Sequence, residues 1–343
     1  MSSSEAFVSV SGRDVRVSSP EKICYPAAGV TKLELAVYYV AVAEGLLRAL
    51  AGRPIALHRF PDGLDGRTSF YTKHAPKGLP EWVQTVRVTF PSGRTGLEVC
   101  VTEPATAVWA VQMNALELHP WPVRREDTDR PDELRVDLDP QPGTGFTQAV
   151  EAAGEAKALF TELGMAPFVK TSGGRGVHLL VRIEPRWSFI ETRHAVIAFA
   201  RELERRRPDL ITTSWWKEER GERVFVDFNQ MARDRMLAAA YSSRATPNAQ
   251  VSMPVRWSEL PDVAPEDFTV RTVPALFAER GDAHEGIDEA PATLDALLEM
   301  SARDTHDRGL GDLPYPPDFP KMPGEPKRVQ PSKARADTGH EHE

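Results

Sequence analysis

Two aspartates separated by a single leucine, Asp137 and Asp139, are the residues of this chain most suited to chemistry. The stretch 134–140 is otherwise rich in residues that favour extended backbone and ends at Pro140, so it predicts a strand. Side chains alternate across a strand, which puts both carboxylates on one face and Leu138 behind them. Neighbouring carboxylates repel each other unless a proton or cation lies between them, and Mg²⁺ or Mn²⁺ prefers such oxygen ligands. Two solvated aspartates at a strand end are the alternative interpretation.

A third aspartate, Asp227, lies within the strongly apolar run Val224–Phe228, which predicts another strand. A charge inside such a run is costly unless it is paired, so Asp227 is the natural third ligand. Three carboxylates from two strands are the ligand set of a two-metal site for phosphoryl or nucleotidyl transfer.

A glycine-rich turn, Ser172–Gly176, separates two predicted strands at 167–171 and 177–183. Its backbone N–H groups, together with Ser172, Arg175 and His178, suit the oxygens of a phosphate. The turn lacks the spacing of a P-loop and precedes a strand instead of a helix. A plain glycine hairpin is the alternative.

Two lysines near the N-terminus form a second candidate site. Thr31 and Glu34 have the spacing of a capping box, which predicts a helix from there to Gly52. Lys32 then lies in the first helical turn, where the helix dipole disfavours a cation. Paired with Lys22 in the preceding loop, it could receive a phosphate.

Three aromatic or imidazole side chains complete the set of candidates. Phe70 and Tyr71 are flanked by basic residues and either stack on bases or lie on opposite faces of a strand, one of them in the core. A helix is expected from Pro104 through Leu116, with His119 in the loop at its end, from where it could reach a site.

The elements that must position these residues alternate between helix and strand. We expect a hairpin over 6–18, a strand over 54–60, a hairpin over 85–102, helices over 147–163 and 188–207, and short acidic helices over 263–303. The Pro-rich stretch 309–343 is expected to be an extended or disordered tail.

Composition narrows the class of protein. The 343 residues carry a net charge of −8, but residues 261–313 alone hold 13 acidic and 4 basic side chains, so the remainder is nearly balanced. A protein in which acidic and basic side chains nearly balance is expected to bind DNA through a few defined contacts, and not to bind along DNA indiscriminately. Neither a membrane span nor a secretory signal is evident, and two cysteines exclude a disulfide framework, so a cytoplasmic enzyme is the simplest expectation.

Six stretches occur together in this order: EKICYP (21–26), FYTK (70–73), ALELHPW (115–121), DLDP (137–140), TSGGRGVH (171–178) and VFVD (224–227). In them the chain resembles the polymerase domain of bacterial ligase D, a branch of the archaeo-eukaryotic primase superfamily, over residues 6–300. The resemblance implies an α+β, primase-polymerase fold, in which an RRM-like catalytic sheet is packed beside a second sheet with surrounding helices. We expect a catalytic domain over 1–300, with an N-terminal α/β module at 1–125, the RRM-like module at 126–260 and an acidic helical segment at 261–308.

The same resemblance implies an activity. The chain would be a metal-dependent, DNA-directed polymerase or primase-polymerase that adds nucleotides, with ribonucleotides preferred, to 3′ ends at gaps or breaks. Its task would be DNA end joining or gap-filling repair at the nucleoid, with two Mn²⁺ or Mg²⁺ ions as cofactors. Partners would be DNA bearing a 5′-phosphate, nucleoside triphosphates, a separate DNA ligase and an end-binding protein, because no ligase or nuclease portion accompanies the polymerase.

Individual roles follow from the matching motifs. Asp137, Asp139 and Asp227 would be the catalytic metal ligands, and Lys22 and Lys32 would bind the 5′-phosphate. Phe70 and Tyr71 would stack on the template. The nucleoside triphosphate would be held by His119, Ser172, Arg175, His178, Arg220, Gln230 and Arg244. Two residues depart from the family pattern: Arg175 replaces a usual lysine, and His58 stands where a basic residue is common.

Two other functions compete with polymerisation. A DNA-end or gap-binding module that has lost catalysis and recruits a ligase would keep the lysine pair without needing all three aspartates. A metal-dependent phosphohydrolase would share the D-x-D pattern, but the aspartyl-phosphate type continues with Gly-Thr or Gly-Val, whereas Pro140 and Gln141 follow here.

Overall fold

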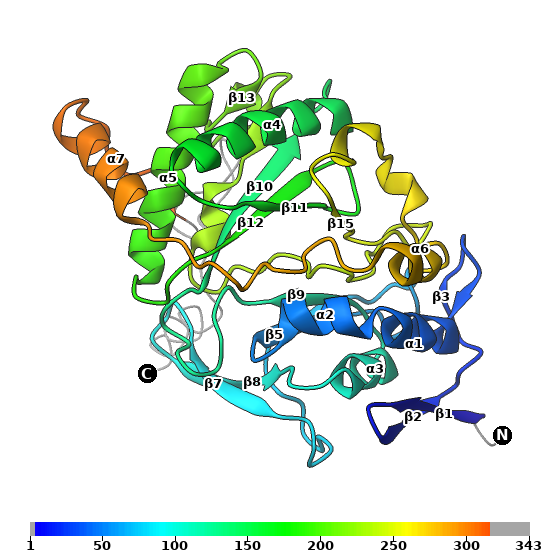
Figure 1. The fold of residues 1–343 in the computed structure, drawn as a ribbon. Coiled ribbons are helices and arrows are strands. Elements are labelled where there is room, and N and C mark those ends of the chain that lie inside the picture. Colours follow the sequence, from blue (N-terminus) through cyan, green and yellow to red (C-terminus); the bar gives the residue numbers. More distant parts are fainter. Residues whose placement is uncertain (1–3, 316–343) are drawn as a thin grey trace, which may run out of the picture.

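The computed structural model describes residues 4–315. It contains two main β-sheets, stacked one above the other in Figure 1, with helices outside each. The catalytic sheet consists of β10 (Glu133–Pro140), β11 (Phe168–Thr171), β12 (Val177–Arg182), β13 (Ile211–Thr212), β14 (Val224–Val226) and β15 (Pro254–Val255). The second sheet consists of β5 (Pro54–Arg59), β6 (Phe70–Thr72), β7 (Thr85–Thr89), β8 (Thr95–Cys100) and β9 (Ala115–Pro120).

The strand order of the catalytic sheet puts the D-x-D strand near its centre. The order is β13-β14-β10-β12-β11-β15, and β10 pairs antiparallel with both β12 and β14. Two long helices, α4 (Phe146–Glu162) and α5 (Phe189–Arg206), pack against the sheet. Val136 and Leu138 are fully buried, so the apolar positions of β10 pack into the core while the aspartates face away from them.

The second sheet has the order β6-β5-β8-β7, with β9 also paired to β5. Three helices lie beside it: α1 (Lys32–Ala41), α2 (Ala43–Leu50) and α3 (Ala105–Gln112). The expected single helix over 31–52 is therefore two helices that meet at Val42. The capping box at its start is confirmed, since Thr31 accepts from the Glu34 N–H and Glu34 accepts from the Thr31 N–H.

The expectation for residues 104–119 was wrong in its second half. Helix α3 ends at Gln112, and Asn114 takes a positive φ of 60° that turns the chain back. Residues 115–120 then form β9 and pair along their length with β5. His119 is consequently a buried strand residue and not part of a loop.

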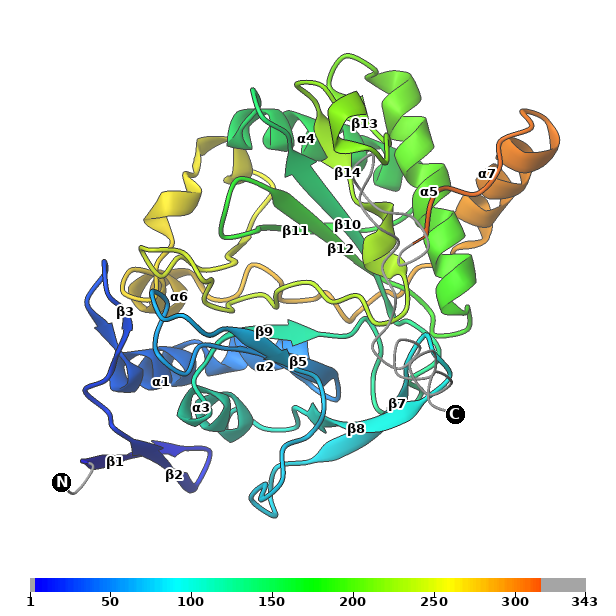
Figure 2. The ribbon, with the colours of Figure 1, turned by 180° about the vertical axis from the view of Figure 1, so that it is seen from behind.

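The remaining elements surround the two sheets. They are the hairpin β1 (Glu5–Val10) and β2 (Arg13–Ser18), the pair β3 (Ile23–Tyr25) and β4 (Val30–Thr31), and the helices α6 (Val273–Arg280) and α7 (Asp295–His306). Helix α7 packs along α5 (Figure 2). The predicted tail at 309–343 is described only to Tyr315, and its remainder lies outside the described residues.

One apolar core connects these parts, running from Val8 in β1 to Leu297 in α7. The division into modules at 1–125, 126–260 and 261–308 stays a prediction. Among the described residues, no helix is both long and apolar enough to cross a membrane.

Candidate active site

Three carboxylates meet at the edge between β10 and β14. Asp137, Asp139 and Asp227 each offer an oxygen within 4.8 Å of the others. Asp227 follows β14 directly: the strand ends at Val226, two residues earlier than expected, and Asp227 caps the short 3-10 helix η2 (Phe228–Met231). The Asp227 N–H donates to the Asp137 carbonyl at 2.9 Å, which fixes the two strands at this point. An all-oxygen set of this kind fits Mg²⁺ or Mn²⁺.

The side chain of Gln230 lies between two of these carboxylates. Its Nε2 is 3.1 Å from Asp137 Oδ2 and 3.4 Å from Asp227 Oδ2. An amide N–H that donates to two like charges offsets part of their repulsion. Gln230, expected to line the nucleotide pocket, therefore also contacts the carboxylates themselves.

A row of three polar residues crosses the catalytic sheet. In the strand register Asp137 faces His178, and His178 faces Lys170, so the three share one face of the sheet. Lys170 is 1% exposed. Its Nζ lies 2.6 Å from His178 Nδ1 and 2.5 Å from the hydroxyl of Ser252, and His178 Nε2 lies 3.3 Å from Asp137 Oδ1. Burial lowers the pKa of Lys170 and of His178 well below their ordinary values.

This row determines the tautomer of His178. Ser252 donates its hydroxyl hydrogen to the carbonyl of Thr171, so Lys170 must donate to Ser252. If His178 carried its proton on Nδ1, its bare Nε2 would face a carboxylate oxygen and repel it. The Nε2–H tautomer, with Lys170 donating to Nδ1, satisfies both ends. His178 therefore presents an N–H donor on the side of the carboxylates.

The glycine turn is organised by Ser172. The N–H groups of Gly174 and Gly176 both donate to its hydroxyl oxygen at 3.1 Å. The expectation that these amides face a phosphate is therefore wrong for two of them, because they point into the turn. Gly173 adopts a φ of +72° and a Cβ there would strike Arg244, while a Cβ on Gly176 would strike the carbonyl of Leu138. The glycines let the turn approach both neighbours closely.

The three arginines differ in their positions. Arg175 is exposed on the turn. Arg220 is buried and stacks over the Phe225 ring at 3.4 Å. Burial lowers the pKa of its guanidinium, and the charges of Asp227 and Asp139 offset only part of this effect. Arg244 forms an ion pair with the carboxylate of Glu117.

Glu117 connects several of the predicted residues, although its own role was missed. Its Oε2 lies 2.7 Å from His58 Nδ1 and 2.9 Å from His119 Nε2, and its Oε1 lies 3.0 Å from Arg244 Nε. Against the effect of burial, these partners hold the pKa of Glu117 far below its ordinary value, while burial lowers the pKa of His119. Tyr71 stacks on His58 with ring centroids 4.1 Å apart.

The two adjacent aromatics are both exposed, Phe70 at 41% and Tyr71 at 49%, so neither is a core residue. The guanidinium of Arg59 lies 5.2 Å from the Phe70 ring centroid. Both rings remain accessible for stacking, next to the glutamate-centred cluster on β9.

The lysine pair lies apart from the carboxylates, where the loop after β5 meets β3. Lys22 Nζ donates to the Pro61 carbonyl and to Asn114 Oδ1, and Lys32 Nζ donates to the Ser18 carbonyl at 3.2 Å. Burial and the neighbouring ammonium of Lys22 lower the pKa of Lys32 to about 8. Two cations held this closely suit a doubly charged anion.

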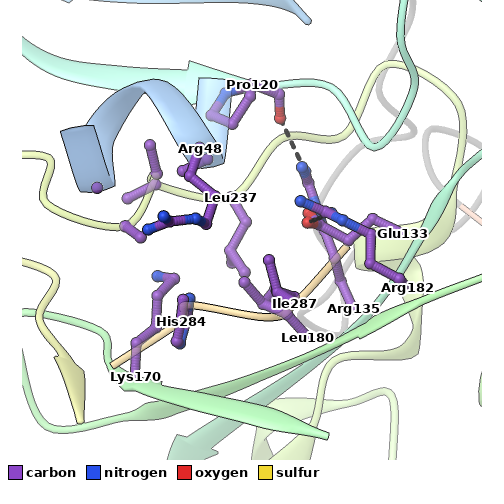
Figure 3. Close-up of a pocket in the computed structure, with 15 residues that line it drawn as sticks. Arg48, Pro120, Glu133, Arg135, Lys170, Leu180, Arg182, Leu237, His284 and Ile287 are labelled. Carbon is purple, nitrogen blue, oxygen red and sulfur yellow. Dashed lines mark hydrogen bonds and ion pairs between the residues drawn. The ribbon is translucent and has the colours of Figure 1, made fainter. Parts of the chain in front are cut away.

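A small cavity adjoins the site on the N-terminal side of Asp137 (Figure 3). Lys170 and His284 lie at one end of it, and Arg135, Glu133 and Arg182 at the other. Arg135 donates to the Pro120 carbonyl at 2.7 Å and to Glu133 at 2.8 Å, which connects β10 to the end of β9. These buried contacts hold the second sheet in position against the carboxylate strand.

Sequence reasoning missed Glu117, Lys170 and Arg59. Glu117 and His119 have the alternation of a strand, a signal hidden by the helix expected there. Lys170 is a lone cation in a short apolar strand, the same signal that identified Asp227.

Comparison with known proteins identifies the family to which most of this chain is similar. The family model of the LigD primase-polymerase domain matches residues 31–284. The multifunctional non-homologous end joining protein LigD of Mycolicibacterium smegmatis is 32% identical over 92% of this chain and 41% of its own length. The bifunctional non-homologous end joining protein LigD of Bacillus subtilis is 30% identical over 76% of this chain and 42% of its own length. The chain thus spans less than half the length of these curated relatives.

A solved structure extends the likeness to three dimensions. The polymerase domain from Mycobacterium tuberculosis ligase D, in complex with DNA, superposes with a TM-score of 0.75 at 30% identity, covering 81% of this chain and 99% of that one. The fold class expected from the sequence motifs is thereby confirmed. This chain belongs to the LigD primase-polymerase domain family.

Proposed function

We propose that this chain is a nucleotidyltransferase that extends DNA 3′ ends in end joining or gap-filling repair. The observation that carries the proposal is the convergence of Asp137, Asp139 and Asp227 within 4.8 Å in a LigD polymerase-family fold. These residues would hold two divalent cations, Mn²⁺ or Mg²⁺. Such ions, when bound, supply charge stabilisation for the attacking and leaving oxygens.

The chain's own cations would bind and orient the triphosphate. Arg220 beside Asp227 and Arg244 beside the glycine turn offer guanidinium donors, and Arg175 is exposed at the turn's tip. With nucleotide bound, His178 would share its Nε2–H between Asp137 and a phosphate oxygen, and Ser172 would donate its hydroxyl. Several fixed donors around one polyphosphate stabilise charge that develops during transfer.

The base and sugar of the nucleotide would lie against His119 and Gln230. Glu117 holds the His119 ring through Nε2, so the ring has a fixed orientation toward its ligand. We infer that this rigid polar pocket is the origin of a preference for ribonucleotides, since a 2′-hydroxyl can donate and accept there. Tyr71, stacked on His58, and Phe70 would support the template base.

Lys22 and Lys32 would bind the 5′-phosphate of the downstream strand at a gap or break. Such a substrate implies action at the nucleoid, followed by a DNA ligase activity that seals the nick, with an end-binding protein that presents the ends. The exposed aromatics lie on β6, which pairs with β5, and Lys22 contacts Pro61 in the loop that follows β5.

The test is primer extension on a gapped duplex with and without a 5′-phosphate, supplied with Mn²⁺ and with each ribo- and deoxyribonucleotide. Asp227→Asn should lower incorporation more than about 100-fold, because it removes a charged ligand, while gap binding stays within about threefold. The matched control is Asp262→Asn, an exposed aspartate far along the chain, which should behave as the unaltered protein.

The same assay separates the alternatives. Unchanged incorporation by Asp227→Asn would refute the proposed catalytic role. Tight binding of the phosphorylated gap without incorporation by the unaltered protein would instead support the non-catalytic DNA-binding module.

A further inference from the structure

The last described residues, 309–315, return from helix α7 to the catalytic sheet. This C-terminal segment bonds first to α7 and then to α5: the Leu310 N–H donates to the carbonyl of Asp304 in α7 at 2.9 Å, and Arg201 on α5 donates to the Gly311 carbonyl at 2.6 Å. Leu313 packs against the main apolar core. The segment lies beyond residues 31–284, which the family model matches.

Arg193 of α5 binds this segment with both terminal nitrogens of its guanidinium group. It is 4% exposed. Its Nη1 donates to both carboxylate oxygens of Asp312, at 2.8 and 2.9 Å, and its Nη2 donates to the carbonyls of Leu313 and Pro314, at 2.6 and 3.2 Å. The guanidinium carbon lies 5.2 Å from the centroid of the Tyr315 ring. An arginine has five N–H donors, and four of the acceptors here come from the C-terminal segment.

The fifth donor of Arg193 leads to the catalytic turn. Its Nε donates to Asn229 Oδ1 at 2.9 Å, and Asn229 Nδ2 donates to the Pro314 carbonyl at 3.1 Å. Both ends of the Asn229 amide are thus held, one by α5 and one by the C-terminal segment. The backbone N–H of Asn229 donates to Asp227 Oδ1 at 3.1 Å. A continuous set of hydrogen bonds therefore joins residues 312–314 to a carboxylate of the candidate active site.

The turn that carries Asp227 needs such support. Helix η2 has only four residues, and a 3-10 turn has few and poorly aligned hydrogen bonds of its own. Asp227 must also be held near two other carboxylates that repel it. Without the C-terminal segment, Arg193 would keep a buried charge with most of its acceptors gone, and the Asn229 amide would lose a partner.

We infer that the C-terminal segment is a positioning element of the polymerase site. Through Arg193 and Asn229 it sets the orientation of the Asp227 carboxylate, and hence the affinity of the three aspartates for divalent cations. The inference rests on the proposed function for its biological meaning. Its physical content is metal affinity, which can be measured without turnover.

Direct Mn²⁺ binding is the appropriate readout, measured from the EPR signal of free Mn²⁺ without nucleotide or DNA. In the full chain, Arg193→Gln should weaken Mn²⁺ binding about tenfold, in the range found when groups that orient metal ligands are removed. Arg193→Lys should not restore it, because one ammonium group cannot reach both the segment and Asn229. Asp312→Ala changes a half-exposed carboxylate and should weaken Mn²⁺ binding about threefold. This variant is expected to stay folded, so it tests the inference even if Arg193→Gln unfolds the protein.

The matched control is Arg201→Gln. Arg201 lies on the same helix and binds the same segment at Gly311, but within the described part of the chain no hydrogen bond joins it to η2. It should lower the melting temperature by a similar amount while leaving Mn²⁺ affinity unchanged. Binding of a phosphorylated gap should stay within about twofold in all four variants, since the lysine pair lies elsewhere.

The outcomes discriminate between the two proposals. Unaltered Mn²⁺ affinity in both Arg193→Gln and Asp312→Ala would overturn the inference, as would an equal loss in Arg201→Gln. If the unaltered chain binds Mn²⁺ and the variants weaken it, but no nucleotide is incorporated, the positioning role stands and the polymerase proposal fails.

Discussion

Raising the pH from 7 to 9 is expected to remove about tenfold of the preference for a gap that carries a 5′-phosphate. The group responsible is Lys32, whose pKa is lowered to about 8 by burial and by the ammonium of Lys22. Below pH 7 the free protein holds Lys32 protonated and ready for the anion. Above pH 8 the amine is neutral, and binding must first take up a proton.

The magnitude follows from this pKa. A pKa near 8 leaves about nine-tenths of Lys32 protonated at pH 7 and about one-tenth at pH 9, so phosphate affinity falls about tenfold between them. The phosphate itself is nearly a full dianion throughout, because its second pKa is about 6. The effect therefore belongs to the protein.

The assay is fluorescence anisotropy at constant ionic strength, with phosphorylated and unphosphorylated gaps titrated at pH 7, 8 and 9. The ratio of the two dissociation constants should fall about tenfold, while binding of the unphosphorylated gap changes little. The matched variant is Lys32→Arg, whose guanidinium stays charged to pH 9, so its ratio should be flat. A flat ratio in the unaltered protein, or an equal slope in Lys32→Arg, would refute the assignment of the phosphate to this lysine.

Two further expectations concern buried groups. Glu98 is fully buried and accepts a hydrogen bond from Trp121 Nε1 at 2.8 Å, and burial raises its pKa to about 8. Between pH 4.5 and 8 the folded state keeps Glu98 protonated, whereas the unfolded chain ionises it. The free energy of unfolding should therefore fall by roughly 4 kcal/mol as the pH rises through this interval. Glu98→Gln should remove this decline in denaturant titrations across that interval, and an unchanged slope would contradict the assignment. Lys170→Met should raise the nucleotide KM about tenfold, because His178 is released from the Nε2–H tautomer, with a small change in kcat. Steady-state primer extension measures the split, and a loss confined to melting temperature would indicate a purely structural lysine.

Local sequence was sufficient for much of the fold. The capping box at Thr31 begins α1 as expected, and a second one at Ser188 begins α5 at the start of the helix expected over 188–207, because the side chain and the amide it caps lie within one turn. Alternation places Asp137 and Asp139 on one face of β10 for the same reason, since a strand's period is local. The joint motifs were specific enough to identify the family.

Residues 115–120 show where local information fails. Ala, Leu and Glu favour helix, yet the segment is β9 because it pairs with β5 from Ile55 to Arg59. Pairing and burial between distant segments outweigh helix propensities that differ by less than about 1 kcal/mol per residue. Because a helix was expected here, His119 was assigned to a loop and the role of Glu117 was missed.

The sequence by itself determined which residues carry charge and, for the three aspartates, which strands present them. Only the tertiary structure decided the partners of the buried charges: Lys170 with His178 through strand register, Glu117 with Arg244 across 127 positions, and Arg193 with Asp312 across 119 positions. The physical reason is that a buried charge requires a partner but its side chain does not specify which one. That choice is made by sheet pairing and by the path of the loops that bring distant groups together.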